Sequence, residues 1–269
     1  MHHRPALPAL ALIALASLAG CSPAPAEPAA LPPGIVVDYQ LGGAYDPADA
    51  VGGVVRDAGD PPAPGLYSVC YLNGFQTQPA DRALWVAERA DLVLTTGGEP
   101  VIDENWPDEL ILDISTAERR ERIAGLQEEA IRGCAASGFD AVEFDNLDSY
   151  TRSGGAFDVD DALDLAGRYT DIAHDAGLAS GQKNAAELGG RGREQAGFDF
   201  VVAEECHRFD ECAAYTAVYG EAVIDIEYSD DLRGDFSDAC DDPAAPRSTV
   251  LRDRDLVTPA DEGYVFESC

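Results

Sequence analysis

Eight short apolar runs, each ending in polar side chains, constrain the fold of this 269-residue chain more than any other feature. Amphipathic helical patterns separate several of them, most clearly at residues 117–136 and 160–176, where apolar side chains recur every three or four positions. Strands that alternate with helices predict an α/β fold with a parallel sheet covered by helices, and eight strands predict a single (β/α)8 TIM barrel. The runs span residues 35–40, 53–57, 67–73, 141–146, 178–184, 200–205, 223–228 and 249–253.

Two further apolar runs, at residues 91–96 and 109–115, exceed this count. We interpret them as parts of an insertion after the third strand, which would form one wall of the site. The alternative is that the run at 53–57 is not a barrel strand and that one of these two takes its place. No internal repeat or second linker indicates another domain.

The first 34 residues are expected to lie outside the barrel domain, which then comprises residues 35–269. In residues 1–20 a weakly basic start and an apolar run precede Leu18-Ala19-Gly20-Cys21, which resembles a bacterial lipoprotein signal. The run is too short for a convincing membrane span, so we expect cleavage before Cys21, lipidation of its thiol and anchoring at the cell envelope. Ordinary secretion is the alternative. Residues 21–34 are rich in proline and alanine and predict a tether.

Export would place the other six cysteines in an oxidising compartment, where an even number favours disulfides. A zinc site is the alternative, but the chain has no Cys-x-x-Cys motif and only two histidines beyond the predicted signal. We expect three pairs. They are Cys206 with Cys212, which are close in sequence, Cys240 with Cys269, which would fasten the C-terminus, and by elimination Cys70 with Cys134.

The chain is strongly acidic, with 50 Asp and Glu against 18 Lys and Arg and a formal net charge of −32. Nucleic acid is a poor partner for such a surface, because phosphate binding needs clustered basic residues. A cationic ligand would be attracted, although solubility or salt tolerance could also explain the charge. Lys183 is the only lysine in the sequence, which gives its position special interest.

Polar side chains that end the strands of a barrel converge on one rim. A single Asp or Asn there is explained by capping of the next helix. Carboxylates from three strands around one lysine instead indicate a catalytic site. The rim would collect Tyr39, Gln40, Asn73, Asp145, Asn146, Lys183, Asn184, Glu204, Glu205, Glu227, Tyr228, Arg252 and Asp253.

Strand alternation refines this set, since residues two apart share a face. If Asp145 points into the barrel mouth, so does Glu143, while Phe144 faces the helices. Paired carboxylates suit glycoside hydrolysis, in which one group attacks or stabilises the oxocarbenium-like centre and the other protonates the leaving oxygen. Lys183 would keep Asp145 ionised, and partial desolvation would raise the pKa of Glu204.

Three segments carry a family resemblance: GFDAVEFDNLDSY at 138–150, GQKN at 181–184 and VVAEECHRFDEC at 201–212. They resemble the endo-α-1,4-polygalactosaminidase family of TIM-barrel glycoside hydrolases, with weaker matches over residues 35–230. The resemblance implies Asp145 as the nucleophile, Glu204 as the acid/base, retention of configuration, no cofactor, and a galactosamine-containing polysaccharide substrate that is cationic where its amines are free. Phe144 and Ala203 stand where the family usually has proline and asparagine.

Two other functions remain open at this point. The chain could be a non-catalytic carbohydrate-binding envelope protein on the same barrel, or a metal-dependent hydrolase with Asp145, Asp148 and Glu204 as ligands, although the nearby Lys183 would compete with a metal. For the leading hypothesis, the expected substrate-binding residues are Tyr39, Gln40, Asn73, Glu143, Asn146, Asp148, Tyr150, Lys183, Asn184, Glu227 and Tyr228.

Overall fold

The structure is a computed structural model that describes residues 1–2 and 27–269. Most of the predicted signal, Cys21 and the first part of the predicted tether lie outside the described residues. None of the helices in the described part of the chain has both the length and the apolar character needed to cross a membrane.

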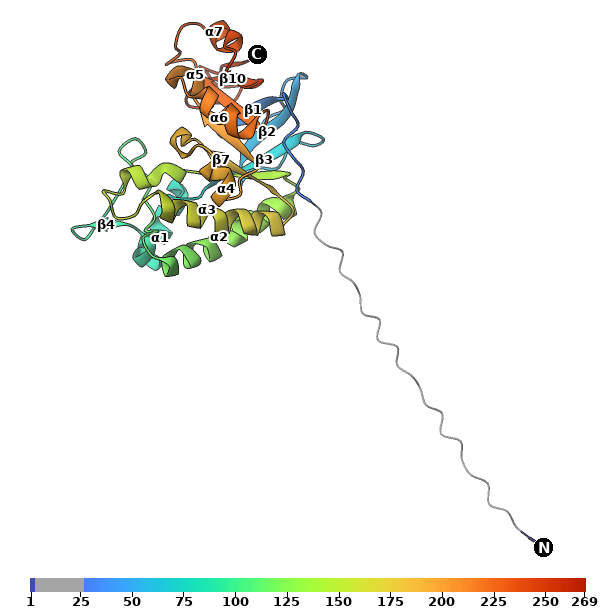
Figure 1. The fold of residues 1–269 in the computed structure, drawn as a ribbon, viewed down its shortest axis with the longest axis vertical. Coiled ribbons are helices and arrows are strands. Elements are labelled where there is room, and N and C mark those ends of the chain that lie inside the picture. Colours follow the sequence, from blue (N-terminus) through green and yellow to red (C-terminus); the bar gives the residue numbers. More distant parts are fainter. Residues whose placement is uncertain (3–26) are drawn as a thin grey trace.

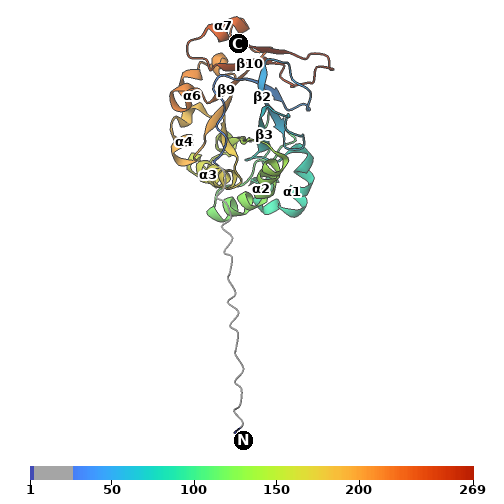
Figure 2. The same cartoon turned by 90° about the vertical axis from the view of Figure 1, so that its right-hand side faces the viewer.

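Nine strands form one sheet in the order β1-β2-β3-β6-β7-β8-β9-β10-β11. Each pair from β1 to β10 is parallel, whereas β11 runs antiparallel to β10. Strand β1 also packs close to β10, so the sheet curls into a nearly closed barrel, with β3 and β9 on opposite sides (Figure 2). The strands are β1 (Val36–Gln40), β2 (Val51–Asp57), β3 (Tyr67–Asn73), β6 (Ala141–Asp145), β7 (Ala179–Lys183), β8 (Phe200–Glu204), β9 (Val223–Tyr228), β10 (Ser248–Arg252) and β11 (Phe266–Ser268).

All eight runs that we predicted as barrel strands are strands of this sheet, and the parallel sheet with covering helices is confirmed. The alternative that the run at 53–57 is not a barrel strand is wrong, because β2 pairs with both β1 and β3. The alternation with helices is incomplete. Within residues 27–269, loops without a helix connect β1 to β2 and β2 to β3.

Helices cover the sheet on the β3 to β10 side (Figure 1). The two long helices, α2 (Ala117–Ser137) and α3 (Val159–Asp175), lie side by side, and their ends follow from local sequence. The Thr116 side chain accepts a hydrogen bond from the Arg119 N–H at the start of α2, and Asp158 and Asp161 form a capping box at α3. Gly138 ends α2 at φ 94°, a left-handed conformation that glycine adopts without strain.

The helices and 3-10 turns are α1 (Arg82–Glu88), α2 (Ala117–Ser137), α3 (Val159–Asp175), α4 (Arg191–Gln195), α5 (Cys206–Phe209), α6 (Cys212–Tyr219), α7 (Phe236–Asp241), η1 (Pro79–Asp81), η2 (Ala90–Leu92), η3 (Leu147–Arg152) and η4 (Ala186–Leu188).

Residues 74–116 connect β3 to α2 where we expected an insertion. They contain η1, α1, η2 and a small hairpin of β4 (Thr95–Thr96) and β5 (Glu99–Pro100). Bridges such as Gln76 with Ile111 fold the segment back on itself, and residues 110–112 are fully buried. Because the segment leaves the carboxyl end of β3, it begins at the rim of the barrel.

The apolar core has two layers that follow the alternation of the strands. One fills the barrel interior with side chains such as Val37, Val202 and Ile226, and the other lies between the sheet and the helices. On β6, Ala141 belongs to the inner layer and Phe144 to the outer one, where its ring stacks on Tyr169 of α3 at 4.9 Å between centroids. The predicted orientation of Phe144 is confirmed.

The three expected disulfides are present. Cys70–Cys134 joins β3 to α2, and Cys206–Cys212 closes a short loop behind β8. Cys240–Cys269 fastens the C-terminus to α7, next to which it lies in Figure 1.

Candidate active site

The single lysine of the chain lies at the centre of the barrel mouth. Lys183 ends β7 with its side chain pointing inward and is only 2% exposed. Its Nζ lies 3.4 Å from Asp145 Oδ1, 3.3 Å from Glu204 Oε2 and 3.7 Å from Glu143 Oε1. It also donates a hydrogen bond to Tyr39 Oη at 2.9 Å. Burial alone would lower the pKa of Lys183, but the three carboxylates raise it well above its usual value, so the ammonium stays charged.

Both oxygens of Asp145 have donors besides the lysine. Tyr71 Oη donates to Oδ2 at 2.7 Å, and the backbone N–H of Asn146 donates to Oδ1 at 2.7 Å. Asn146 itself has a left-handed backbone, with φ 63°, which turns the chain sharply after β6. The carboxylate is therefore held in one orientation at the end of β6.

Glu204, at the end of β8, is held equally firmly. Tyr228 Oη donates to Oε1 at 2.5 Å and Asn184 Nδ2 donates to Oε2 at 3.0 Å, while Asn184 Oδ1 accepts from the Glu204 N–H at 2.8 Å. Burial would raise the pKa of Glu204, but Lys183 and these hydrogen bonds outweigh it and lower the pKa below its ordinary value. Our expectation of a raised pKa is wrong, because the lysine contacts this carboxylate as well as Asp145.

Glu143 lies beneath this pair and is fully buried. Tyr39 Oη donates to its Oε1 at 2.6 Å, and its Oε2 has no hydrogen-bond partner. Burial raises the pKa of Glu143 to about 7, against the opposing effect of Lys183. Its enclosed position places it as a support for the lysine rather than in contact with a ligand.

Asn73 and Asn146 form a second polar group next to Asp145. Asn146 Nδ2 donates to Asn73 Oδ1 at 3.1 Å, and Asn73 Nδ2 donates to Glu109 Oε2 at 2.8 Å. Gln76 Nε2 donates to Asn146 Oδ1 at 3.1 Å. The residues that follow β3 and β6 are thus joined to the segment 74–116.

Other predicted substrate-binding residues lie apart from the lysine. Gln40 accepts a hydrogen bond from Arg56 Nε at 2.9 Å, and Asp148 pairs with Arg152 at 2.8 Å. Tyr150 Oη donates a hydrogen bond to the carboxylate of Glu187, which lies outside the group around Lys183. None of these three contacts Lys183 or the carboxylates beside it in the described structure.

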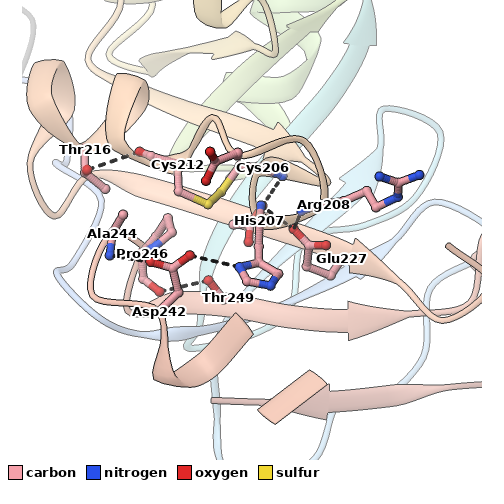
Figure 3. The surroundings of a disulfide bond; sticks show 12 residues. Cys206, His207, Arg208, Cys212, Thr216, Glu227, Asp242, Ala244, Pro246 and Thr249 are labelled. Atoms are coloured by element: carbon pink, nitrogen blue, oxygen red, sulfur yellow. Dashed lines mark hydrogen bonds and ion pairs between the residues drawn. A yellow bond between two sulfur atoms is a disulfide. The ribbon is translucent and has the colours of Figure 1, made fainter. Parts of the chain in front are cut away.

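Glu227 lies on the outer face of β9, because Tyr228 points inward and neighbouring strand residues alternate. Its Oε1 accepts from the backbone N–H groups of His207 and Arg208 at 2.8 and 3.4 Å, as Figure 3 shows. The prediction that Glu227 joins the rim is therefore wrong. It anchors the start of α5 instead.

Two residues of the site were missed by the sequence analysis. Tyr71 lies two positions before Asn73 on the same face of β3, so strand alternation could have found it. Arg254 follows the last barrel strand and had no comparable signal. Its guanidinium lies 4.5 Å from the ring centroid of Tyr228 and pairs with Glu205 at 2.8 Å. Glu205 is thus connected to Tyr228 at the rim through Arg254.

The metal alternatives find little support in these contacts. In the described part of the chain, Cys206, Cys212 and Asp225 are close enough to share an ion, but the two cysteines form a disulfide (Figure 3). Asp148 pairs with an arginine rather than with Asp145 and Glu204, so those three carboxylates do not form one cluster.

A buried lysine between two hydrogen-bonded carboxylates at the rim of a parallel barrel is an arrangement that fits glycoside hydrolysis. The family model described as glycoside-hydrolase family GH114 matches residues 20–269. The chain belongs to this family. This match confirms the glycoside hydrolase family expected from the sequence.

Solved structures share this barrel fold at low sequence identity. Ega3 of Aspergillus fumigatus, in complex with galactosamine, is 21% identical and has a TM-score of 0.68, covering 88% of this chain and 96% of its own. A variant of the glycoside hydrolase domain of PelA from Pseudomonas aeruginosa is 14% identical with a TM-score of 0.59, covering 86% and 97%. At these identities the similarity shows the fold. No curated protein matches the sequence significantly.

The buried Glu143 gives the stability of this GH114 chain a specific pH dependence. Its folded pKa of about 7 exceeds the ordinary 4.5, so the folded state binds this proton more tightly than the unfolded state. Stability from this group is full below pH 4.5, falls as the pH rises and is lost above pH 7, a change of about 3 kcal/mol.

Glu143→Gln, which mimics the protonated carboxyl, should therefore lose less stability than the wild type between pH 5 and pH 8. Urea unfolding at both values measures the difference. Glu129→Gln, on the exposed side of α2, is the matched control and should follow the wild type. If Glu143→Gln and the wild type showed the same pH dependence of stability, Glu143 would not be the group whose raised pKa causes it.

Proposed function

We propose that this GH114 member is a retaining endo-glycosidase that cleaves an α-1,4-linked galactosamine-containing polysaccharide. Asp145 is the nucleophile and Glu204 the acid/base. The observation that carries the proposal is the contact of both carboxylates with the buried Lys183 ammonium. Asp145 ends β6 and Glu204 ends β8, the two strands that flank β7 and its Lys183. We also infer a (β/α)8-type barrel in which residues 74–116 form the insertion.

In the first step an oxygen of Asp145 attacks the anomeric carbon, and the glycosidic carbon–oxygen bond breaks. The proton of Glu204 passes to the departing oxygen. In the second step Glu204 takes a proton from water, whose oxygen bonds to the anomeric carbon as the ester to Asp145 breaks. Tyr71 and Lys183 hold Asp145 for the attack, since both contact its carboxylate.

The separation of the two carboxylates supports retention. Asp145 Oδ1 and Glu204 Oε2 contact the same nitrogen at 3.4 and 3.3 Å, so these atoms are at most about 6.7 Å apart, below most of the roughly 6.5 to 9.5 Å range of inverting enzymes. A water molecule between the carboxylates would have little room.

The contact of both Asp145 and Glu204 with Lys183 also supports the two-step cycle. In the free enzyme Lys183 lowers the pKa of Glu204 below the ordinary 4.5, so the protonated acid is the major form only at acidic pH below that value. Once Asp145 becomes a neutral ester, its negative charge no longer interacts with the Lys183 ammonium. The ammonium then stabilises the ionised form of Glu204 more strongly. That is the form that must accept a proton from water in the second step.

The substrate follows from charge and family. The Ega3 structure contains galactosamine, and a net charge of −32 would attract a polymer that carries free amines. We further propose that lipidation of Cys21 anchors the enzyme at the cell envelope. The retained residues 21–34 would then act as a tether between the membrane and the barrel.

Incubation with an α-1,4-linked galactosamine polymer tests the function directly. We expect internal cleavage to short oligosaccharides, read by mass spectrometry, with the new reducing ends in the α configuration when first released, read by a rapid NMR time course. An initial β product would overturn retention. No cleavage of either the free-amine or the N-acetylated polymer would overturn the function.

The roles of the two carboxylates are tested by substitution. Asp145→Asn and Glu204→Gln should each lower kcat at least about a hundredfold, as is typical of lost acid–base or nucleophilic groups, while circular dichroism stays native. Glu205→Gln is the matched control and should keep substantial activity, because Glu205 reaches the site only through Arg254. Full activity in either of the first two variants would refute its assignment.

Lys183→Met should lower kcat more than about tenfold and move the descending, alkaline limb of the pH profile to higher pH. The ammonium favours ionised Glu204, so its loss raises the pKa of that acid and keeps it protonated to higher pH. Lys183→Arg retains the charge, and its profile should stay nearer to that of the wild type. An alkaline limb that does not move in Lys183→Met would exclude this role.

A further inference from the structure

The loop Asp103–Glu109 reaches the rim beside Asp145. Glu109 Oε2 accepts hydrogen bonds from Asn73 Nδ2 at 2.8 Å and Asn146 Nδ2 at 3.4 Å. Asn73 ends β3, and Asn146 directly follows Asp145. The segment 74–116 thus brings a further carboxylate, from a loop, to the candidate site, although Glu109 lies far along the chain from Asp145 and Glu204.

Glu109 is a carboxylate without a cation. It is 8% exposed, and within the described residues its second oxygen, Oε1, has no hydrogen-bond or ion-pair partner and is not fully enclosed. Burial raises the pKa of Glu109 to about 7. Asp145 and Asp103 add to this effect, while the Asn73 hydrogen bond and Arg152 oppose it.

The contrast with Glu204 is informative, since that carboxylate is also buried but has Lys183 at 3.3 Å. Arg152 could serve Glu109 in the same way, yet its Nε pairs with Asp103 at 2.8 Å and its Nη1 with Asp148 at 2.8 Å. An external cation at Oε1 would therefore find a partly desolvated, unpaired carboxylate.

The same loop presents an exposed tryptophan. Trp106 is 60% exposed, whereas Trp85, the other tryptophan of the chain, is buried. The ends of the loop are tied to the rim, because Gln76 Nε2 donates to Asp103 Oδ2 at 3.0 Å and Asn73 Nδ2 donates to Glu109 Oε2 at 2.8 Å. An exposed, flat aromatic face three residues before Glu109 on the same loop suits a sugar ring, and such a face also attracts a nearby cation.

We propose that the loop Asp103–Glu109 forms a subsite for an amino sugar with a free amine. Glu109 Oε1 pairs with the sugar ammonium, and Trp106 packs on the adjoining part of the polymer. The identity of the polymer rests on the proposed function, but binding at the loop does not require turnover. An N-acetylated unit brings no charge to Glu109 and would leave its oxygen without an ionic partner.

Calorimetry in the Asp145→Asn background tests the subsite without hydrolysis. The probes are an α-1,4-linked galactosamine oligosaccharide and its fully N-acetylated form. Glu109→Gln, which is close to isosteric, should weaken binding of the free-amine form about tenfold or more, the typical effect of a lost charge-assisted hydrogen bond, and change the acetylated form less than about twofold. Trp106→Ala should weaken both forms.

Glu104→Gln is the matched control, because Glu104 is exposed on the same loop and carries the same charge. Equal weakening by Glu104→Gln and Glu109→Gln would show long-range attraction only and overturn the subsite. Equal loss of both probes in Glu109→Gln would show a merely structural role and also overturn it.

The pH dependence supplies an independent measurement. Affinity for the free-amine probe should fall as the pH drops through the pKa of Glu109, because Glu109 is then protonated before binding, and Glu109→Gln should abolish this dependence; that pKa is about 7 in the wild type and lower in the Asp145→Asn background, where the Asp145 charge is removed. If the wild type hydrolyses the polymer but binds the free-amine and N-acetylated probes equally well, the subsite is refuted and the proposed catalysis is not. A free-amine preference that depends on Glu109, without hydrolysis by the wild type, would refute the proposed catalysis alone.

Discussion

The contact of the Lys183 ammonium with three carboxylates is the interaction on which the rest of the barrel mouth depends. A charge that is only 2% exposed must be neutralised by near neighbours, and Asp145, Glu204 and Glu143 provide this within 3.7 Å. The three acids compete for one cation. The result is unequal, because the pKa of Glu204 falls while that of the more deeply buried Glu143 rises to about 7. A substitution at any one of these charged groups therefore changes the electrostatic environment of the others.

Three tyrosines distribute the remaining hydrogen bonds around this centre. Each carboxylate accepts from one phenol: Glu143 from Tyr39, Asp145 from Tyr71 and Glu204 from Tyr228. Burial raises the pKa of every one of these phenols well above its usual value, so they remain donors across the working range of an enzyme. Neutral donors from β1, β3 and β9 thus supplement the single positive charge without competing with it.

The sequence predicted the sheet well because each strand carries its own signal, an apolar run that closes on polar residues. Strand alternation also placed Glu143 inside and Phe144 outside. The same rule, applied to Tyr228, would have removed Glu227 from the rim. The pKa of Glu204 was mispredicted because sequence spacing cannot show that one lysine contacts two acids. Glu109 could not be found, because only the tertiary fold of residues 74–116 brings it to β3 and β6.

The backbone turns directly after β6, β7 and β8 also determine the geometry of the site. Asp145, Lys183 and Glu204 are each followed by a residue with left-handed backbone, Asn146 at φ 63°, Asn184 at φ 48° and Glu205 at φ 61°. Asparagine tolerates this conformation, whereas for glutamate it costs on the order of 1 kcal/mol. The sharp turn lets Asn146 and Asn184 hydrogen-bond back to the cluster. Glu205 pairs with the partly exposed Arg254, whereas Asn184 and Tyr228 bond the Glu204 carboxylate directly, so the geometry of Glu204 is set by residues at the ends of the two strands that flank β8.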